Sequence, residues 1–85
     1  MITADTITDE QIRELREQAA RWLDQNPASA IGDRIRLDDW SAQHSTFTSA
    51  QIALGEKRPR RGSTKRAARA RCAEILNARQ NGGRP

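Results

Sequence analysis

One long amphipathic helix is predicted near the start of the chain. Its apolar positions recur at helical spacing and are Ile12, Leu15, Ala19, Trp22 and Leu23. Charged residues fill the opposite face. Thr8 and Gln11 match a capping box, in which each side chain bonds the backbone N–H of the other residue. The helix should end by Asn26, because Pro27 disfavours helical geometry in the residue before it.

The next segment, from Asn26 to Asp39, gives an ambiguous pattern. Asn26 and Pro27 suit the first two positions of a second helix, and the apolar residues after them allow one helical face. Gly32 weakens that pattern, and the RIRL stretch at 34–37 also suits a strand. We expect a helix here, followed by a short helical turn at Asp38 or Asp39.

The first helix start, ITDEQI from Ile7, is almost repeated as FTSAQI from Phe47. This second copy predicts an N-cap at Thr48 and a short helix over 49–57, which Pro59 and Gly62 would close off. The residues after the two copies do not correspond. The pattern is therefore one capping device used twice and not a repeat.

A last helix is predicted from a Ser63 cap to about Asn81, with a narrow apolar stripe of mostly small residues. Together these elements predict an all-α fold, a small bundle of three to four helices with a basic loop and a basic C-terminal helix. Residues 1–81 would form a single small domain and 82–85 a frayed tail. The expected core is Ile12, Leu15, Trp22, Leu23, Ile35, Trp40, Phe47, Ile52, Ile75 and Leu76.

The apolar content is low for a folded chain of 85 residues, with no Val and no Tyr, and a single Cys72 excludes an internal disulfide. A partner or a homodimer could complete such a marginal core. The single cysteine, the lack of a signal-peptide pattern and the lack of a long apolar run predict a cytoplasmic protein without a membrane span.

Charge is strongly polarised along the chain. Residues 1–56 carry five Arg against ten acidic residues, whereas residues 57–85 carry ten Lys and Arg against Glu74 alone. The stretch KRPRRGSTKRAARAR at 57–71 holds eight cations and no acid, and four of them fall at the start of the last helix, where the helix dipole is already positive. A bound anion would offset the repulsion between these cations and the positive end of the helix dipole.

A helix start with free N–H groups, hydroxyls and flanking arginines is a natural phosphate site. The predicted nucleic-acid-binding residues are Lys57, Arg58, Arg60, Arg61, Ser63, Thr64, Lys65, Arg66, Arg69 and Arg71. Two other interpretations stay open. The run could be a solvated basic face that pairs with the acidic first half, within the chain or across a dimer, or it could contact a partner protein.

Base-specific reading has less support, because the predicted connection before Ser63 is too long for a helix-turn-helix and no aromatic residue interrupts the basic run. Catalysis has none. Cys72 lies on an apolar stripe and is expected in the core. His44 is expected in a polar loop, SAQHST, with no second His or Cys at metal-ligand spacing. Adjacent Asp38 and Asp39 suit a helix start better than paired acid–base work. We expect no enzyme activity, cofactor or metal.

The stretches TITDEQIRELREQA at 6–19 and RARCAEILNAR at 69–79 resemble a loose group of short helical proteins encoded by phages, plasmids and prophages of GC-rich bacteria. The resemblance covers about a third of the chain. It implies an accessory protein of a mobile genetic element with nothing catalytic. The sequence thus predicts a binder of DNA or RNA through 57–71, mainly by phosphate contacts. The alternative is an inhibitor of a host nucleic-acid-handling complex that acts by protein contact, as anti-CRISPR proteins do.

Overall fold

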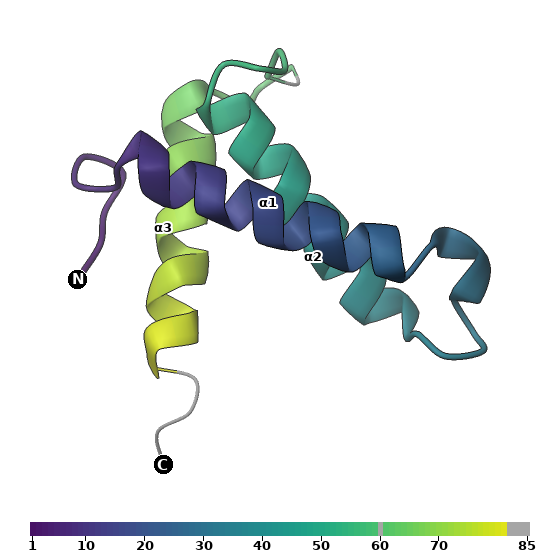
Figure 1. Ribbon diagram of the computed structural model, residues 1–85. Helices are drawn as coiled ribbons and strands as arrows, with labels where there is room; N and C mark the ends of the chain where they lie inside the picture. The colour runs from purple at the N-terminus through teal and green to yellow at the C-terminus, as the bar shows by residue number, and fades with distance from the viewer. Residues whose placement is uncertain (60, 82–85) are drawn as a thin grey trace.

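The computed structural model describes residues 1–59 and 61–81 of the chain. Its elements are α1 (Asp9–Gln25), a 3₁₀ turn (Ala28–Ala30), α2 (Leu37–Ala53) and α3 (Lys65–Asn81). Helix α2 runs back along α1, and α3 crosses beside them (Figure 1). The predicted all-α fold, a small helical bundle, is confirmed. The predicted tail at 82–85 lies outside the described residues.

Helix α1 begins and ends as its sequence predicts. The Thr8 hydroxyl accepts from the Gln11 N–H at 3.1 Å, and the Gln11 side-chain oxygen accepts from the Thr8 N–H at 2.9 Å. At the other end, both the backbone N–H and the side-chain amide of Asn26 donate to the Trp22 carbonyl, each at 2.9 Å. Asn26 therefore closes α1, and it does not start a second helix as predicted.

The predicted helix after Asn26 is wrong. Only the 3₁₀ turn forms, and the Ala30 carbonyl then accepts from the N–H groups of Asp33, Arg34 and Ile35. Gly32 has φ +91°, a left-handed conformation that interrupts a helix and that glycine adopts without steric cost. The alternative strand is reduced to one isolated bridge between Ile31 and Ile35. A tight turn, closed on one carbonyl, replaces both predicted elements.

The predicted cap at Thr48 and the predicted helix over 49–57 are also wrong. Thr48 lies inside α2, which starts at Leu37 with Asp38 and Asp39 in its first turn and continues to Ala53 without a break. No Gly or Pro stands between Leu37 and Ala53, and acidic residues in a first turn stabilise a helix start. The capping pattern at Thr48 is thus overridden by a helix that has already begun.

Helix α2 ends in a Schellman motif. Gly55, at φ +79°, donates its N–H to the Ile52 carbonyl, and the Glu56 N–H reaches the Gln51 carbonyl at 2.9 Å. The left-handed glycine turns the chain sharply into the basic loop. Glu56 itself forms an ion pair with Arg16 of α1, which ties this corner to the first helix.

The core is built largely from small side chains. Its buried cluster consists of Ile7, Ile12, Leu15, Ala50, Ile52, Ala53, Ala68, Cys72 and Ala73. Small residues let α2 approach both neighbouring helices closely, and α1 and α3 contact each other little. Cys72 is a core residue as expected, and burial raises the pKa of its thiol.

The predicted core is only partly correct. Ile12, Leu15, Ile35 and Ile52 are buried. The other predicted members are at most partly enclosed and are Trp22, Leu23, Trp40, Phe47, Ile75 and Leu76. Alanines occupy the helix contacts, so the large residues are displaced to the edges of the bundle.

Candidate nucleic-acid interface

The basic segment 57–71 spans the loop after α2 and the first half of α3. Helix α3 is capped by Thr64, whose hydroxyl accepts from the Ala67 N–H at 2.9 Å and whose carbonyl accepts from the Ala68 N–H. The predicted cap at Ser63 is therefore wrong by one residue. Ser63 is exposed and stands in the loop, next to the start of the helix.

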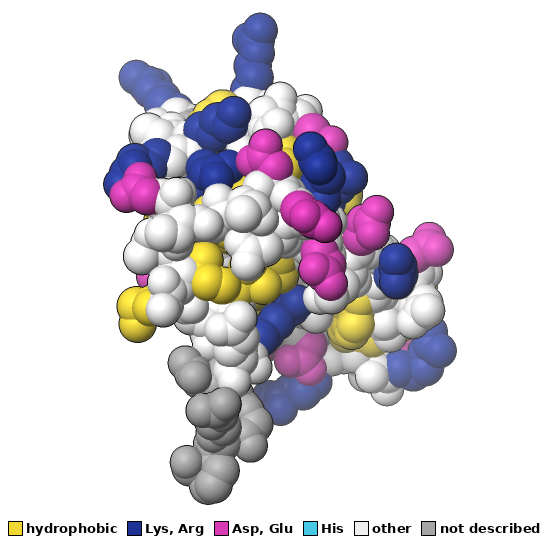
Figure 2. Space-filling view, turned by 60° about the vertical axis from the view of Figure 1, so that its left-hand side comes forward, with side chains coloured by type: hydrophobic (Ala, Val, Ile, Leu, Met, Phe, Trp, Pro, Cys, Tyr) yellow, Lys and Arg dark blue, Asp and Glu magenta, His cyan; other side chains and the backbone are white. Residues whose placement is uncertain are grey.

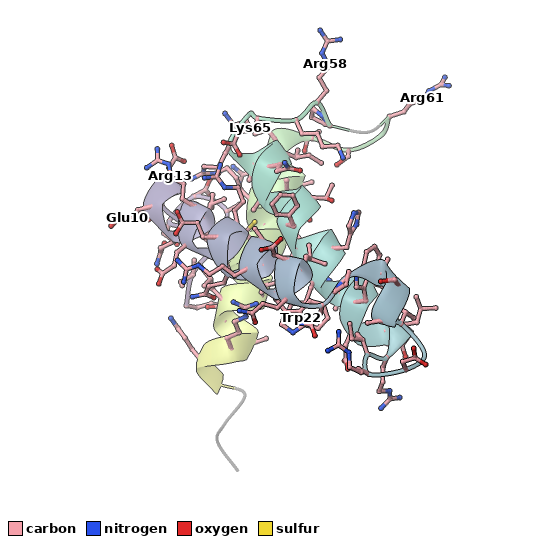
Figure 3. The ribbon with its side chains drawn as sticks, turned by 45° about the vertical axis from the view of Figure 1, so that its right-hand side comes forward. Glu10, Arg13, Trp22, Arg58, Arg61 and Lys65 are labelled. Carbon is pink, nitrogen blue, oxygen red and sulfur yellow. The ribbon has the colours of Figure 1, made fainter. Side chains whose placement is uncertain are left out.

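Four cations of this segment are exposed and form no ion pair with any acid of the described residues: Lys57, Arg58, Arg61 and Lys65. We call them the loop cations. Arg58 and Arg61 extend from the loop into solvent, and Lys65 lies at the base of the same loop (Figure 3). Because Glu56 pairs with Arg16, the acid nearest to the loop does not neutralise them. The predicted site residue Arg60 lies outside the described residues.

Figure 2 shows Lys and Arg side chains gathered at the end of the molecule that carries the loop, where two of them project from the surface. Acidic side chains are interspersed below them. On this face the densest group of Lys and Arg lies at the loop end, and further basic side chains are scattered over the rest of the face.

The arginines in the first half of α3, Arg66, Arg69 and Arg71, are arranged differently, because each pairs with an acid. Arg66 forms a bidentate pair with Asp5 at 2.6 and 3.1 Å, and Arg71 reaches Glu74 at 3.4 Å. The hydrogen bonds from Arg66 hold the pKa of the Asp5 carboxyl below its ordinary value. Part of the basic run therefore pairs with the acidic first half of the chain, and the loop cations do not.

Arg69 fastens residues 2–8, which we call the N-terminal arm, onto α3. Its guanidinium donates to the Ile7 carbonyl at 2.6 Å and to the Ala4 carbonyl at 3.4 Å, and it pairs with Asp9 at 2.9 Å. The Arg69 side chain is only 22% exposed. Farther along α3, the Asn77 amide holds the backbone N–H and C=O of Ile2 at 3.0 and 2.7 Å. Arg69 is thus partly enclosed and bonded to the arm.

Arg13 of α1 is a cation near this site that the sequence did not single out. Both Arg13 and Lys65 lie close enough to Asp9 to help lower the pKa of its carboxyl, after the larger effect of the Arg69 hydrogen bond. Figure 3 places Arg13 and Lys65 at the same end of the molecule. Helical periodicity alone puts Arg13 on a polar face, and only the packing of α3 beside α1 brings it to the basic end.

A groove of about 330 Å³ follows one side of α2 and ends at the loop. His44 is part of α2 and not of a polar loop as predicted, and its ring stacks on Trp40 with 5.0 Å between centroids and 16° between planes. Hydroxyl groups line much of the groove and belong to Ser41, Ser45, Thr48, Ser49 and Ser63. The spacing of Trp40, His44 and Thr48 by four residues was a usable signal, missed because a loop was predicted there.

Two further observations concern residues 1–59 and 61–81. No three His, Cys, Asp or Glu side chains come together there in a way that could hold a metal ion. None of the helices in this described part has the length and apolar character needed to cross a membrane.

Comparison with known proteins yields no match: no family model, no curated protein and no solved structure is significantly similar to the chain. The assignment of a function therefore depends on the geometry and charge of the site.

Proposed function

We propose that this protein binds nucleic acid through phosphate contacts made by the loop cations at one end of the bundle. The observation that supports this proposal best is that Lys57, Arg58, Arg61 and Lys65 are exposed and unpaired with described acids, although acids neutralise the arginines of α3 next to them. Exposed cations on a short loop suit a phosphate backbone, which presents regularly spaced negative charges.

The start of α3 adds to this surface. The first turn of α3 presents backbone N–H groups beside Lys65, and its positive dipole end favours an anion. Ser63 and Thr64 supply hydroxyls there, although the Thr64 hydroxyl already caps the helix. We infer contact without sequence-specific base reading, because contacts to phosphate fix the position of a protein on nucleic acid but carry no sequence information.

We further propose a non-enzymatic role, as an accessory protein of a mobile genetic element acting in the cytoplasm. The one thiol is enclosed in the core, and the one imidazole stacks on an indole instead of facing a nucleophile. The mobile-element origin is supported by the sequence resemblance of 6–19 and 69–79 described above.

A binding assay at several salt concentrations tests the proposal. Fluorescence anisotropy with labelled duplex DNA, single strands and structured RNA should show binding at low salt that weakens as salt rises. Four contacts predict a slope of log K against log salt of about −3.6 on duplex and about −2.8 on single strands. Absence of binding to all three ligands at low salt would refute the proposal.

Two triple variants with equal charge loss separate phosphate contact from overall charge. In the loop variant Lys57, Arg58 and Arg61 become Ala; in the control variant Arg21, Arg34 and Arg36, exposed and near the turn at the other end of α2, become Ala. The loop variant should flatten the slope by about 2 to 3 units, and the control should leave it near that of the parent. Equal slopes for the two variants would show that net charge alone governs binding.

A protein partner is the second candidate. A groove of about 500 Å³ between α2 and α3 has Ala42, Ile75 and Ala78 in its lining, and the side-chain oxygen of Gln43 is buried there without a hydrogen-bond partner in the described residues. A donor from another protein could satisfy that oxygen. This candidate, an inhibitor of a host nucleic-acid-handling complex, gains support if the parent binds no free nucleic acid.

A further inference from the structure

The groove along α2 combines two features that recognise unpaired bases. Its stacked Trp40 and His44 rings present flat aromatic surface, since His44 is exposed and Trp40 is partly exposed. Its walls carry hydroxyls of Ser45, Thr48 and Ser49, which can each donate or accept a hydrogen bond. Aromatic faces stack with any base, and hydroxyls adapt to any base edge, so such a groove favours bases without demanding a sequence.

The groove also ends where phosphate contacts are available. It leads from Trp40 near the start of α2 to Ser63 in the basic loop, so the loop cations stand at one end of it. Asp38 and Asp39, both exposed in the first turn of α2, stand at the other end and repel phosphate. A bound strand is therefore confined to the stretch between the Trp40–His44 stack and the loop.

The length of this stretch sets the size of the ligand. From Trp40 to Ile52, α2 rises about 18 Å at ~1.5 Å per residue, which spans about five nucleotides at the ~3.4 Å spacing of stacked bases. A duplex cannot use the groove in this way, because its bases already stack on each other inside the helix. Unpaired bases can turn toward the rings while their phosphates reach the loop.

We propose that single-stranded nucleic acid is the preferred ligand of this protein, bound with its bases against the Trp40–His44 stack and its backbone at the loop cations. This inference rests on the proposed function and names the ligand class of the same site. The recognition chemistry is common to single-stranded DNA and RNA.

The two tryptophans allow a direct test with a built-in control. Trp22→Phe leaves Trp40 as the only indole, and Trp40→Phe leaves Trp22, which lies near the end of α1 and does not line the groove. The tryptophan fluorescence of each variant is followed at low salt during titration with a ten-nucleotide oligothymidylate, a ten-nucleotide oligouridylate and a hairpin duplex. Anisotropy of the labelled ligand reports binding independently. Circular dichroism checks that both variants keep the helical content of the parent.

In the Trp22→Phe variant, single strands should change the fluorescence of Trp40 at the concentrations where anisotropy shows binding. In the Trp40→Phe variant, the fluorescence of Trp22 should stay nearly constant. His44→Ala, a change at an exposed position, should lower affinity for single strands by about five-fold or more and affinity for the hairpin by less than about two-fold. Equal response to oligothymidylate and oligouridylate supports recognition of bases and phosphates, and a preference for one shows that the sugar or the thymine methyl group contributes.

Three results would overturn the inference. The first is that single strands bind by anisotropy but leave Trp40 fluorescence unchanged, the second that both tryptophans respond equally, and the third that the hairpin binds as tightly as the single strands. In each case the proposed function stands and the groove is not its base-binding part. If none of the ligands binds, the proposed function fails together with the inference.

Discussion

Replacing Arg69 with Met tests whether the N-terminal arm is held on α3 by hydrogen bonds. Methionine keeps most of the aliphatic length of the arginine side chain and removes the guanidinium that donates to the Ile7 and Ala4 carbonyls. The change therefore separates hydrogen bonding from packing. We expect the variant to fold and to be less stable than the parent.

The expected loss can be worked out from the geometry. The Ile7 bond is short, at 2.6 Å, and is made by a charged donor that is mostly enclosed, whereas the Ala4 bond at 3.4 Å is too long to add much. A hydrogen bond to a charged group contributes about 1.5–3 kcal/mol, so Arg69→Met should lower the free energy of unfolding by about 2 kcal/mol. In a domain of this size that corresponds to a fall in Tm of about 8–16 °C.

Thermal unfolding followed by circular dichroism measures this effect, and Arg66→Met is the matched control. Arg66 lies one turn earlier on α3 and also pairs with the arm, but its side chain is 72% exposed, so its loss should change Tm little. Hydrogen exchange should accelerate at the Ile7 N–H, which donates to the Thr3 carbonyl within the arm. Equal melting of the two variants, or unchanged exchange at Ile7, would refute the structural role of Arg69.

Two further predictions concern the edge of the basic surface. Asp5→Asn should raise affinity for nucleic acid and steepen the salt slope by about one unit, because it releases Arg66 for a phosphate. The control Glu10→Gln alters an exposed acid outside any ion pair of the described residues and should leave the slope unchanged. A slope that does not differ between the two variants would contradict this account. Thr64→Ala should cost about 1 kcal/mol in urea unfolding and Ser63→Ala close to nothing, and the reverse order would place the α3 cap at Ser63.

The sequence was informative where structure is set by neighbouring residues. The capping box of Thr8 and Gln11 and the end of α1 before Pro27 follow from contacts within one helical turn, and both are confirmed. The same pattern misled at Thr48, because a cap forms only where the residues before it leave helical geometry. Helix α2 starts at Leu37, eleven residues before Thr48, with Asp38 and Asp39 in its first turn, and no local signal in FTSAQI reveals that.

Features that depend on helix packing could not be predicted from neighbouring residues in the sequence. Large apolar residues such as Trp22 and Phe47 were predicted inside, but alanines let the helices approach so closely that these side chains are left at the edges. Likewise, the basic character of α3 was visible, but not its pairing with acids about sixty residues away. Asp5 and Asp9 reach Arg66 and Arg69 only after the arm has docked on α3.

This pairing changes what the basic segment can do. Counted along the sequence, 57–71 offers eight cations, whereas in the folded chain Asp5 of the arm, Asp9 at the start of α1 and Glu74 occupy three of them. A docked arm therefore limits binding to the loop cations, and a salt slope near −2.8 on single strands is expected from about four contacts. A slope near −5, from about seven contacts, requires the arginines of α3 to exchange Asp5, Asp9 and Glu74 for phosphates. That exchange would free the arm, and faster hydrogen exchange at Ile7 in the complex would then accompany the steeper slope.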